Sequence, residues 1–193
     1  MKKRIYIIHG WDGNPNQHWL PWLKKELESR NFLVNVPEMP DSGNPRKDAW
    51  VKYLADLVKT PDKDTYFVGH SIGCKAVLRY LETLQPGEKI GGAVLVAGWI
   101  TLTNMDERTP DEIRVINDWV NPPFDFDRIK SHCDNFTAIF SDDDPEVPLE
   151  ENKETYENKI GAIIIMEHGK GHFTEDDGVK SLPSALQAIL EMR

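Results

Sequence analysis

The sequence predicts a three-layer α/β fold, in which about six mostly parallel strands lie between two layers of helices. Short apolar runs rich in β-branched residues alternate with segments whose apolar residues recur at helical spacing. The runs are apolar at successive positions, which is typical of parallel strands that helices cover on both faces. No internal repeat or long linker divides the 193 residues, so we expect one domain over residues 1–193.

The first half of the chain begins with a strand from Ile5 to Ile8, which runs into a turn at His9-Gly10. A loop at 13–16 precedes a helix, because apolar residues from Trp19 to Leu27 recur at helical spacing. The further elements expected in this half are a strand at 32–36, a helix around Trp50, Leu54, Leu57 and Val58, a strand at 66–68, a helix from Ile72 to Leu84 and a strand at 93–97.

The second half begins with the least regular stretch of the chain, from Trp99 to Asp134. Prolines at 110, 122 and 123 interrupt it, and we expect a cap segment or an inserted helix over a site. Strands at 136–140 and 162–166 follow, and a last helix covers about 184–192.

Charge and composition exclude several classes of protein. Asp and Glu number 32 against 23 Lys and Arg, which argues against a non-specific nucleic-acid binder. No apolar run approaches the roughly 20 residues that span a bilayer, and the apolar run after the basic start is too short for a signal peptide. Two cysteines, Cys74 and Cys133, are too few for a disulfide scaffold or a Cys-based zinc site. We therefore expect a cytoplasmic protein.

A Gly-x-Ser-x-Gly motif stands at 69–73, directly after one expected strand and directly before a helix. This is the context of a nucleophile elbow, in which a sharp turn exposes the serine hydroxyl above the sheet. The flanking glycines leave room for the strained turn, and the helix N-terminus offers free amides to a developing oxyanion. The motif predicts Ser71 as a nucleophile.

A serine nucleophile needs a base and an acid that orients the base, in the chain order Ser, Asp, His for this fold. Asp144 follows the fifth expected strand and precedes Pro145-Glu146-Val147-Pro148, so we assign it as the acid, with Asp143 as the alternative. Asp142 and Asp143 are otherwise expected to be solvated or to cap the next helix. His172 follows the sixth strand and is the expected base, with His168 as the alternative.

The oxyanion and the substrate need further groups beside Ser71. We expect the backbone amides of Ile72 and Trp11 to form the oxyanion hole. The Gly-rich loop around Trp11 lacks the phosphate-binding G-x-x-x-x-G-K-[ST] pattern. His9, His70 and Trp99 are candidates for the substrate pocket, with core packing as the alternative for Trp99 and a structural role as the alternative for His70. The chemistry requires no metal or organic cofactor.

With these residues in place, the chain resembles the small α/β-hydrolases grouped as retinoblastoma-binding protein 9 and the bacterial YdeN-like serine hydrolases. The resemblance runs from His9-Gly10-Trp11 and Gln17-His18-Trp19 through the serine motif to Gly171-His172-Phe173. It implies Ser71, Asp144 and His172 as the triad. It also implies an α/β-hydrolase fold without its first two strands, because the strand that enters His9-Gly10 normally comes third.

We therefore expect a serine hydrolase that cleaves a carboxylic ester or thioester of modest size, with an amide or small peptide as a further substrate class. The alternative is a non-catalytic or weakly catalytic binding or scaffold protein on the same fold. Neither cysteine lies in an L-x-C-x-E sequence, so we infer no retinoblastoma-protein partner. The sequence contains no signal for a particular oligomeric state.

Overall fold

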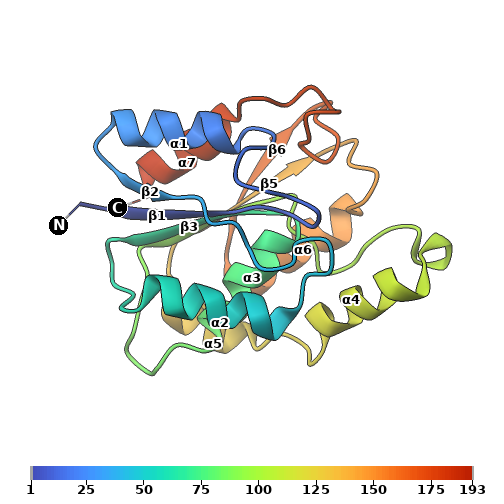
Figure 1. Cartoon of the computed structure of the whole chain (residues 1–193), viewed down its shortest axis with the longest axis horizontal. Coiled ribbons are helices and arrows are strands. Elements are labelled where there is room, and N and C mark those ends of the chain that lie inside the picture. Colours follow the sequence, from blue (N-terminus) through green and yellow to red (C-terminus); the bar gives the residue numbers. More distant parts are fainter. Residues whose placement is uncertain (1, 193) are drawn as a thin grey trace.

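The computed structural model describes residues 2–192 and confirms the expected α/β architecture (Figure 1). Six strands form one sheet in the order β2-β1-β3-β4-β5-β6, and every neighbouring pair is parallel. Because all strands run in the same direction, their carboxyl ends meet at one edge of the sheet. The strands are β1 (Arg4–Ile8), β2 (Leu33–Asn35), β3 (Thr65–His70), β4 (Gly92–Val96), β5 (Phe136–Ser141) and β6 (Ile163–Glu167).

Helices cover both faces of the sheet. On one face lie α1 (Leu20–Ser29) and α7 (Pro183–Glu191), seen above the sheet in Figure 1. The other face is covered by α2 (Lys47–Val58), α3 (Ile72–Leu81), α5 (Phe126–His132) and α6 (Leu149–Ile160). Of the helices in residues 2–192, none is long and apolar enough to cross a membrane.

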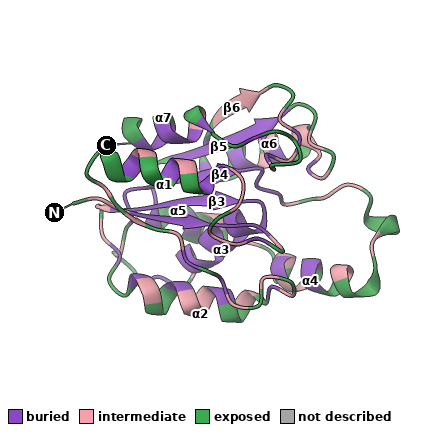
Figure 2. Ribbon diagram, turned by 45° about the horizontal axis from the view of Figure 1, so that its top comes forward, coloured by how far each residue is buried: buried purple, intermediate pink, exposed green. Residues whose placement is uncertain are grey.

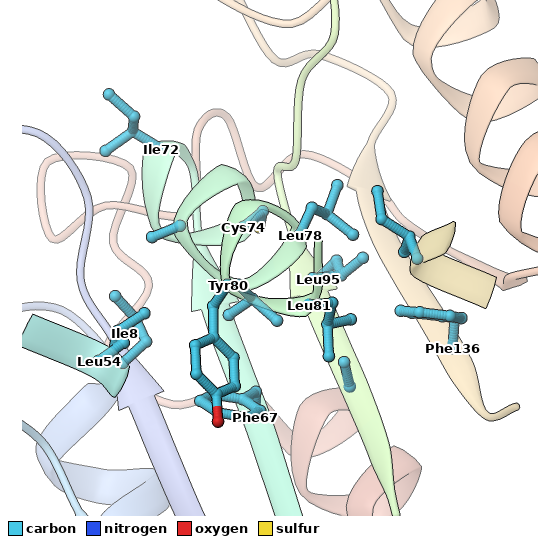
Figure 3. Packing of buried hydrophobic residues seen from close by; sticks show 14 of the residues in the cluster. Ile8, Leu54, Phe67, Ile72, Cys74, Leu78, Tyr80, Leu81, Leu95 and Phe136 are labelled. Atoms are coloured by element: carbon cyan, nitrogen blue, oxygen red, sulfur yellow. The ribbon is translucent and has the colours of Figure 1, made fainter. Parts of the chain in front are cut away.

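Two hydrophobic cores result, one on each face of the sheet. Successive residues of β1 alternate between them, so that Ile5 and Ile7 pack below α1 and α7 while Tyr6 and Ile8 face α2 and α3. The central strands and α3 are buried throughout (Figure 2), and Figure 3 shows α3 packed among side chains of β1, β3, β4 and α2. Burial on both faces explains why these strands are continuous apolar runs in the sequence.

The stretch at 99–134 contains two helices and a 3-10 turn at Met105–Glu107. The first helix, α4 (Pro110–Val120), begins with a capping box in which the Thr109 hydroxyl and the Glu112 carboxylate each accept a backbone N–H of the other residue. Only its C-terminal half is anchored in the core, through Val115, Ile116 and Trp119. The helix lies at the end of the molecule where the strands terminate, as expected for an inserted helix beside a site (Figure 1).

The bounds of the helix expected after Asp143 did not follow from the apolar pattern. Helix α6 connects β5 to β6 and is rich in charged residues. Its buried stripe consists of Asn152, Tyr156 and Ile160, four residues apart. Because Asn152 holds a polar position in that stripe, bonded to the backbone of Ile100, Thr101 and Pro148, the apolar periodicity is too weak to define where this helix begins and ends.

Lys75 on α3 is the one charged side chain of residues 2–192 with 0% exposure. Its Nζ has no hydrogen-bond partner among the described residues and lies 3.9 Å from the centroid of the Trp99 ring. Burial, followed by repulsion from Arg79, lowers the pKa of Lys75 well below its usual range. We expect Lys75→Met to raise the free energy of unfolding by about 1–3 kcal/mol at pH 7, because it removes a buried amine without a hydrogen-bond partner.

The pH dependence of this gain follows from the lowered pKa. Between the folded pKa of Lys75 and its unfolded value of about 10.4, the unfolded chain binds more protons, so the wild type becomes more stable as pH rises. Urea titrations should therefore show the advantage of Lys75→Met shrinking as pH approaches that value. The control is Lys52→Met, at an exposed lysine of α2. Equal stabilities of the Lys75→Met variant and the wild type at pH 7 would contradict the prediction.

Candidate active site

Ser71 occupies a strained turn between β3 and α3. Its φ of 53° and ψ of −120° lie in a region that residues with a side chain rarely adopt. The turn depends on its glycines, since a Cβ on Gly69 would lie 2.7 Å from the Cys74 backbone and one on Gly73 would lie 2.4 Å from the Ile8 carbonyl oxygen. The Ser71 amide donates to the Val96 carbonyl at 2.9 Å, which ties the turn to the end of β4. The residue therefore has the backbone geometry of a nucleophile elbow.

His172 and Asp144 lie side by side at the end of the sheet. The Nδ1 of His172 donates to Oδ2 of Asp144 at 2.8 Å, and the Asp144 side chain is only 3% exposed. The amides of Glu146 and Val147 donate to the other carboxylate oxygen at 2.9 and 3.2 Å. Because a carboxylate only accepts, the proton of a neutral His172 ring stays on Nδ1 and leaves Nε2 as a free base.

The neighbouring aspartates bind other points of the same loop. Asp142 accepts from Nδ1 of His168 at 2.6 Å and from the Gly169 amide at 3.0 Å. Asp143 accepts from the Ser141 hydroxyl at 2.6 Å and from the Gly171 amide at 2.8 Å. These bonds, the Ser141 bond first, lower the pKa of Asp143. Both residues are exposed, as one of the two expectations had it, but neither caps α6, whose N-cap is Pro148. The three consecutive aspartates all bind the loop that carries His172.

Ser71 and His172 line one cavity at the carboxyl ends of the strands. Within residues 2–192, no hydrogen bond joins the Ser71 hydroxyl to His172. In ligand-free enzymes this contact is often long and tightens only when substrate binds. The arrangement brings a carboxylate, an imidazole and a hydroxyl to one end of the sheet, with the imidazole already hydrogen-bonded to the carboxylate.

The two residues whose amides are expected to hold an oxyanion, Trp11 and Ile72, also line this cavity. Ile72 is the first residue of α3, where the helix leaves its amide without an intrahelical partner. The Trp11 loop is held by a bond from the Asp12 amide to the Ser42 carbonyl at 2.9 Å and by one from the Gly13 amide to the Gly10 carbonyl at 3.2 Å. No described residue accepts a hydrogen bond from the amide of Trp11 or of Ile72, so both remain available to a ligand.

The cavity has a volume of about 800 Å³ and is bordered by the loop at 10–13, by α4 and by the loops that carry Asp144 and His172. Two of the expected pocket residues, His70 and Trp99, line it. His9 does not, contrary to expectation. Its Nδ1 donates to the Gly10 carbonyl at 2.9 Å and its Nε2 accepts from the Met39 amide at 3.0 Å, so both ring nitrogens are used inside the protein.

Other residues of the wall were not expected from the sequence. His18 lines the cavity and exchanges hydrogen bonds of 3.0 Å with Glu175 through its backbone amide and its Nδ1. Val115 reaches the cavity from α4, and Arg108 forms an ion pair there with Glu146. Val115 and Arg108 lie in segments without a motif, and the Gln17-His18-Trp19 segment indicated a family rather than a role for His18. Only their position in space identifies these residues as part of the wall. No group of three or more His, Cys, Asp or Glu in residues 2–192 is arranged to hold a metal ion.

Known proteins are similar to this chain in sequence and in fold. Residues 5–191 match a family model described as serine hydrolase. The chain is 34% identical over 183 residues to the putative hydrolase YdeN of Bacillus subtilis. The aligned residues cover 95% of this chain and 92% of YdeN. It is 28% identical over 174 residues to the serine hydrolase RBBP9 of Rattus norvegicus. Here the aligned residues cover 89% of this chain and 87% of that protein. The crystal structure of the ydeN gene product matches with a TM-score of 0.88 at 32% identity, over 99% of this chain and 98% of that one.

Proposed function

This chain belongs to the serine hydrolase family, and on that premise we propose that it cleaves a carboxylic ester or thioester of modest size through Ser71, His172 and Asp144. The observation that carries the proposal is the buried contact between His172 and Asp144 beside a serine with elbow geometry. The serine hydrolase name of the rat relative is consistent with it.

In the first step, Nε2 of His172 removes the Ser71 hydroxyl proton while Oγ attacks the substrate carbonyl. The carbonyl oxygen becomes an oxyanion, which the amides of Trp11 and Ile72 stabilise. The imidazolium then gives its proton to the leaving alcohol or thiol as the carbon–oxygen or carbon–sulfur bond breaks, and an acyl-enzyme remains. Asp144 stabilises the imidazolium through the Nδ1 hydrogen bond.

In the second step, His172 removes a proton from water, whose oxygen attacks the acyl carbon. Collapse of the second oxyanion breaks the bond to Oγ, and the proton returns from Nε2 to Ser71. The carboxylic acid leaves and the enzyme is restored. Each step uses only groups that line the cavity or that hold His172, so the proposed cycle requires no cofactor.

The cavity wall limits the substrate. Trp99, Leu102 and Val115 supply an apolar part of the wall, and the volume of about 800 Å³ suits a small or medium acyl group. This wall supports an ester or thioester of modest size. Amides and short peptides are a second class, since the same steps cleave them when the leaving nitrogen accepts the proton from His172.

Acidic side chains outnumber basic ones around the cavity. Arg108 is paired with Glu146 and Arg114 with Asp111, whereas the Asp12 carboxylate has no basic partner among the described residues. We therefore expect kcat/KM for p-nitrophenyl butyrate to exceed that for mono-p-nitrophenyl succinate by roughly tenfold at low salt, because the succinate carries a carboxylate into an acidic wall.

Two controls separate charge from shape in this comparison. In 1 M salt the ratio should shrink, because ions screen the repulsion. Asp12→Asn should also reduce the ratio of the two kcat/KM values, whereas Asp56→Asn on the exposed surface of α2 should leave the ratio unchanged. A ratio near one in low salt would show that the wall does not select by charge.

The proposal itself is tested with a fluorophosphonate probe and intact-protein mass spectrometry, together with a series of p-nitrophenyl esters of increasing acyl length. We expect one covalent adduct, on Ser71, and turnover that falls for long acyl chains. Absence of both labelling and turnover would favour the alternative of a binding or scaffold protein on a hydrolase fold.

A further inference from the structure

His70 lies between the serine motif and the loop that carries His172. It is the last residue of β3, directly before Ser71, and its side chain is buried although it reaches the cavity wall. Its ring packs edge-on or tilted against three others, with centroid distances of 5.3 Å to His172, 5.6 Å to His18 and 5.9 Å to Trp19. The ring therefore has little freedom to turn.

The hydrogen bonds of His70 determine where its proton sits. Nε2 lies 2.8 Å from the His172 carbonyl oxygen, which can only accept, so Nε2 must carry the proton and donate it. Nδ1 has no partner among the described residues and abuts Gly10, at 3.4 Å from where a Cβ would stand. Burial, followed by the proximity of His172, keeps the pKa of His70 well below its usual range, so the ring is neutral at neutral pH.

The base is thus held at two places. Asp144 holds the His172 side chain through Nδ1, and His70 holds its main chain through the carbonyl. The loop needs such support, because Gly171 and Phe173 on either side of the histidine have φ of 50° and 58°. Asp143 adds a bond to the Gly171 amide, but among residues 2–192 only His70 forms a hydrogen bond directly between this loop and the strand that precedes Ser71.

We propose that His70 is a positioning residue, which sets the distance between Ser71 and His172 by donating from Nε2 to the His172 carbonyl and packing against Gly10. This inference rests on the proposed function of Ser71 and His172. The side chain neither exchanges a proton with substrate nor contacts the reacting atoms. Its role is to keep the base in place while the contact between Ser71 and His172 forms.

The donor's position on the ring suggests a specific set of variants. Glutamine places its amide nitrogen close to the position of Nε2, whereas asparagine reaches only as far as Nδ1, and methionine fills the space without a donor. We expect His70→Met and His70→Asn to lower kcat for a p-nitrophenyl ester by roughly tenfold to a hundredfold with little change in KM, because a base displaced by about 1 Å loses reactivity rather than affinity. We expect His70→Gln to recover most of kcat.

His132 is the matched control. It is the buried last residue of α5, outside the cavity wall, and its Nδ1 donates to the Glu88 carbonyl at 2.7 Å. His132→Met removes the same kind of bond and should lower the melting temperature without lowering kcat at 25 °C. Thermal unfolding of all variants shows which of them remain folded at the assay temperature.

The outcomes distinguish this inference from the proposed function. If the wild type neither turns over esters nor reacts with the fluorophosphonate, the proposed function fails. If the wild type is active and the folded His70→Met variant keeps kcat within twofold, the positioning role is wrong. The same holds if kcat falls equally in the Gln, Asn and Met variants at position 70, since a donor at Nε2 would then not matter.

Discussion

Replacing Ser71 with alanine is expected to lower kcat for an activated ester by roughly 10⁵- to 10⁶-fold, to the level left by the oxyanion hole and binding alone. Alanine keeps the Cβ and fits the same turn, so the elbow and the cavity should remain while the attacking oxygen is lost. Without that oxygen no acyl-enzyme forms, and the fluorophosphonate adduct should disappear.

The measurement is a burst-phase and steady-state assay with p-nitrophenyl esters, accompanied by circular dichroism and intact mass. Ser29→Ala serves as the control, because Ser29 lies at the exposed end of α1, where its hydroxyl donates to the Glu26 carbonyl and accepts from the Arg30 side chain, both far from the cavity. Labelling of Ser71→Ala to the same extent as the wild type would place the nucleophile elsewhere.

Replacing Asp144 with asparagine is the second large effect, with an expected loss in kcat of about 10⁴-fold. An asparagine amide beside Nδ1 favours the tautomer with the proton on Nε2, which cannot take a proton from Ser71. It also withdraws the negative charge that stabilises the imidazolium. The loss should appear mainly in kcat, because the substrate does not touch this buried side chain.

The sequence Asp142-Asp143-Asp144 supplies its own matched controls. Asp143→Asn keeps an oxygen that can accept from Ser141 and Gly171, and we expect its kcat to stay within about tenfold of the wild type. Asp142→Asn alters the exposed bond to His168 and should have less effect. If Asp143→Asn were the more damaged variant at equal stability, the acid would be Asp143.

The strands and most helices could be predicted because the burial of a segment determines which of its positions must be apolar. A strand covered on both faces must be apolar at successive positions, as in β3 and β4, and an amphipathic helix must repeat its apolar residues every three or four positions, as in α2. The bounds of α6 could not be predicted, because its buried stripe includes Asn152, whose side chain bonds to backbone 51 and 52 residues away in sequence. No local pattern encodes such a distant partner.

The candidate site, too, could be predicted only where its features are local in the sequence. A strand–serine–helix motif and the chain order of Ser71, Asp144 and His172 point to a hydrolase, since the turn geometry and the strand ends are local properties of the chain. Choosing among three consecutive aspartates requires knowing where each carboxylate points. That depends on the loop that all of them bind, 27 or 28 residues further along the chain.

The sequence by itself thus determined the α/β fold, the serine hydrolase class and the candidate nucleophile and base. Only the tertiary structure decided that Asp144 faces His172, that His9 lies outside the cavity and that His70 links β3 to the loop of the base. The physical reason is that residue type and periodicity report burial and local turns, whereas a hydrogen bond of 2.8 Å between residues 102 apart in the chain exists only when the whole sheet brings their strands together.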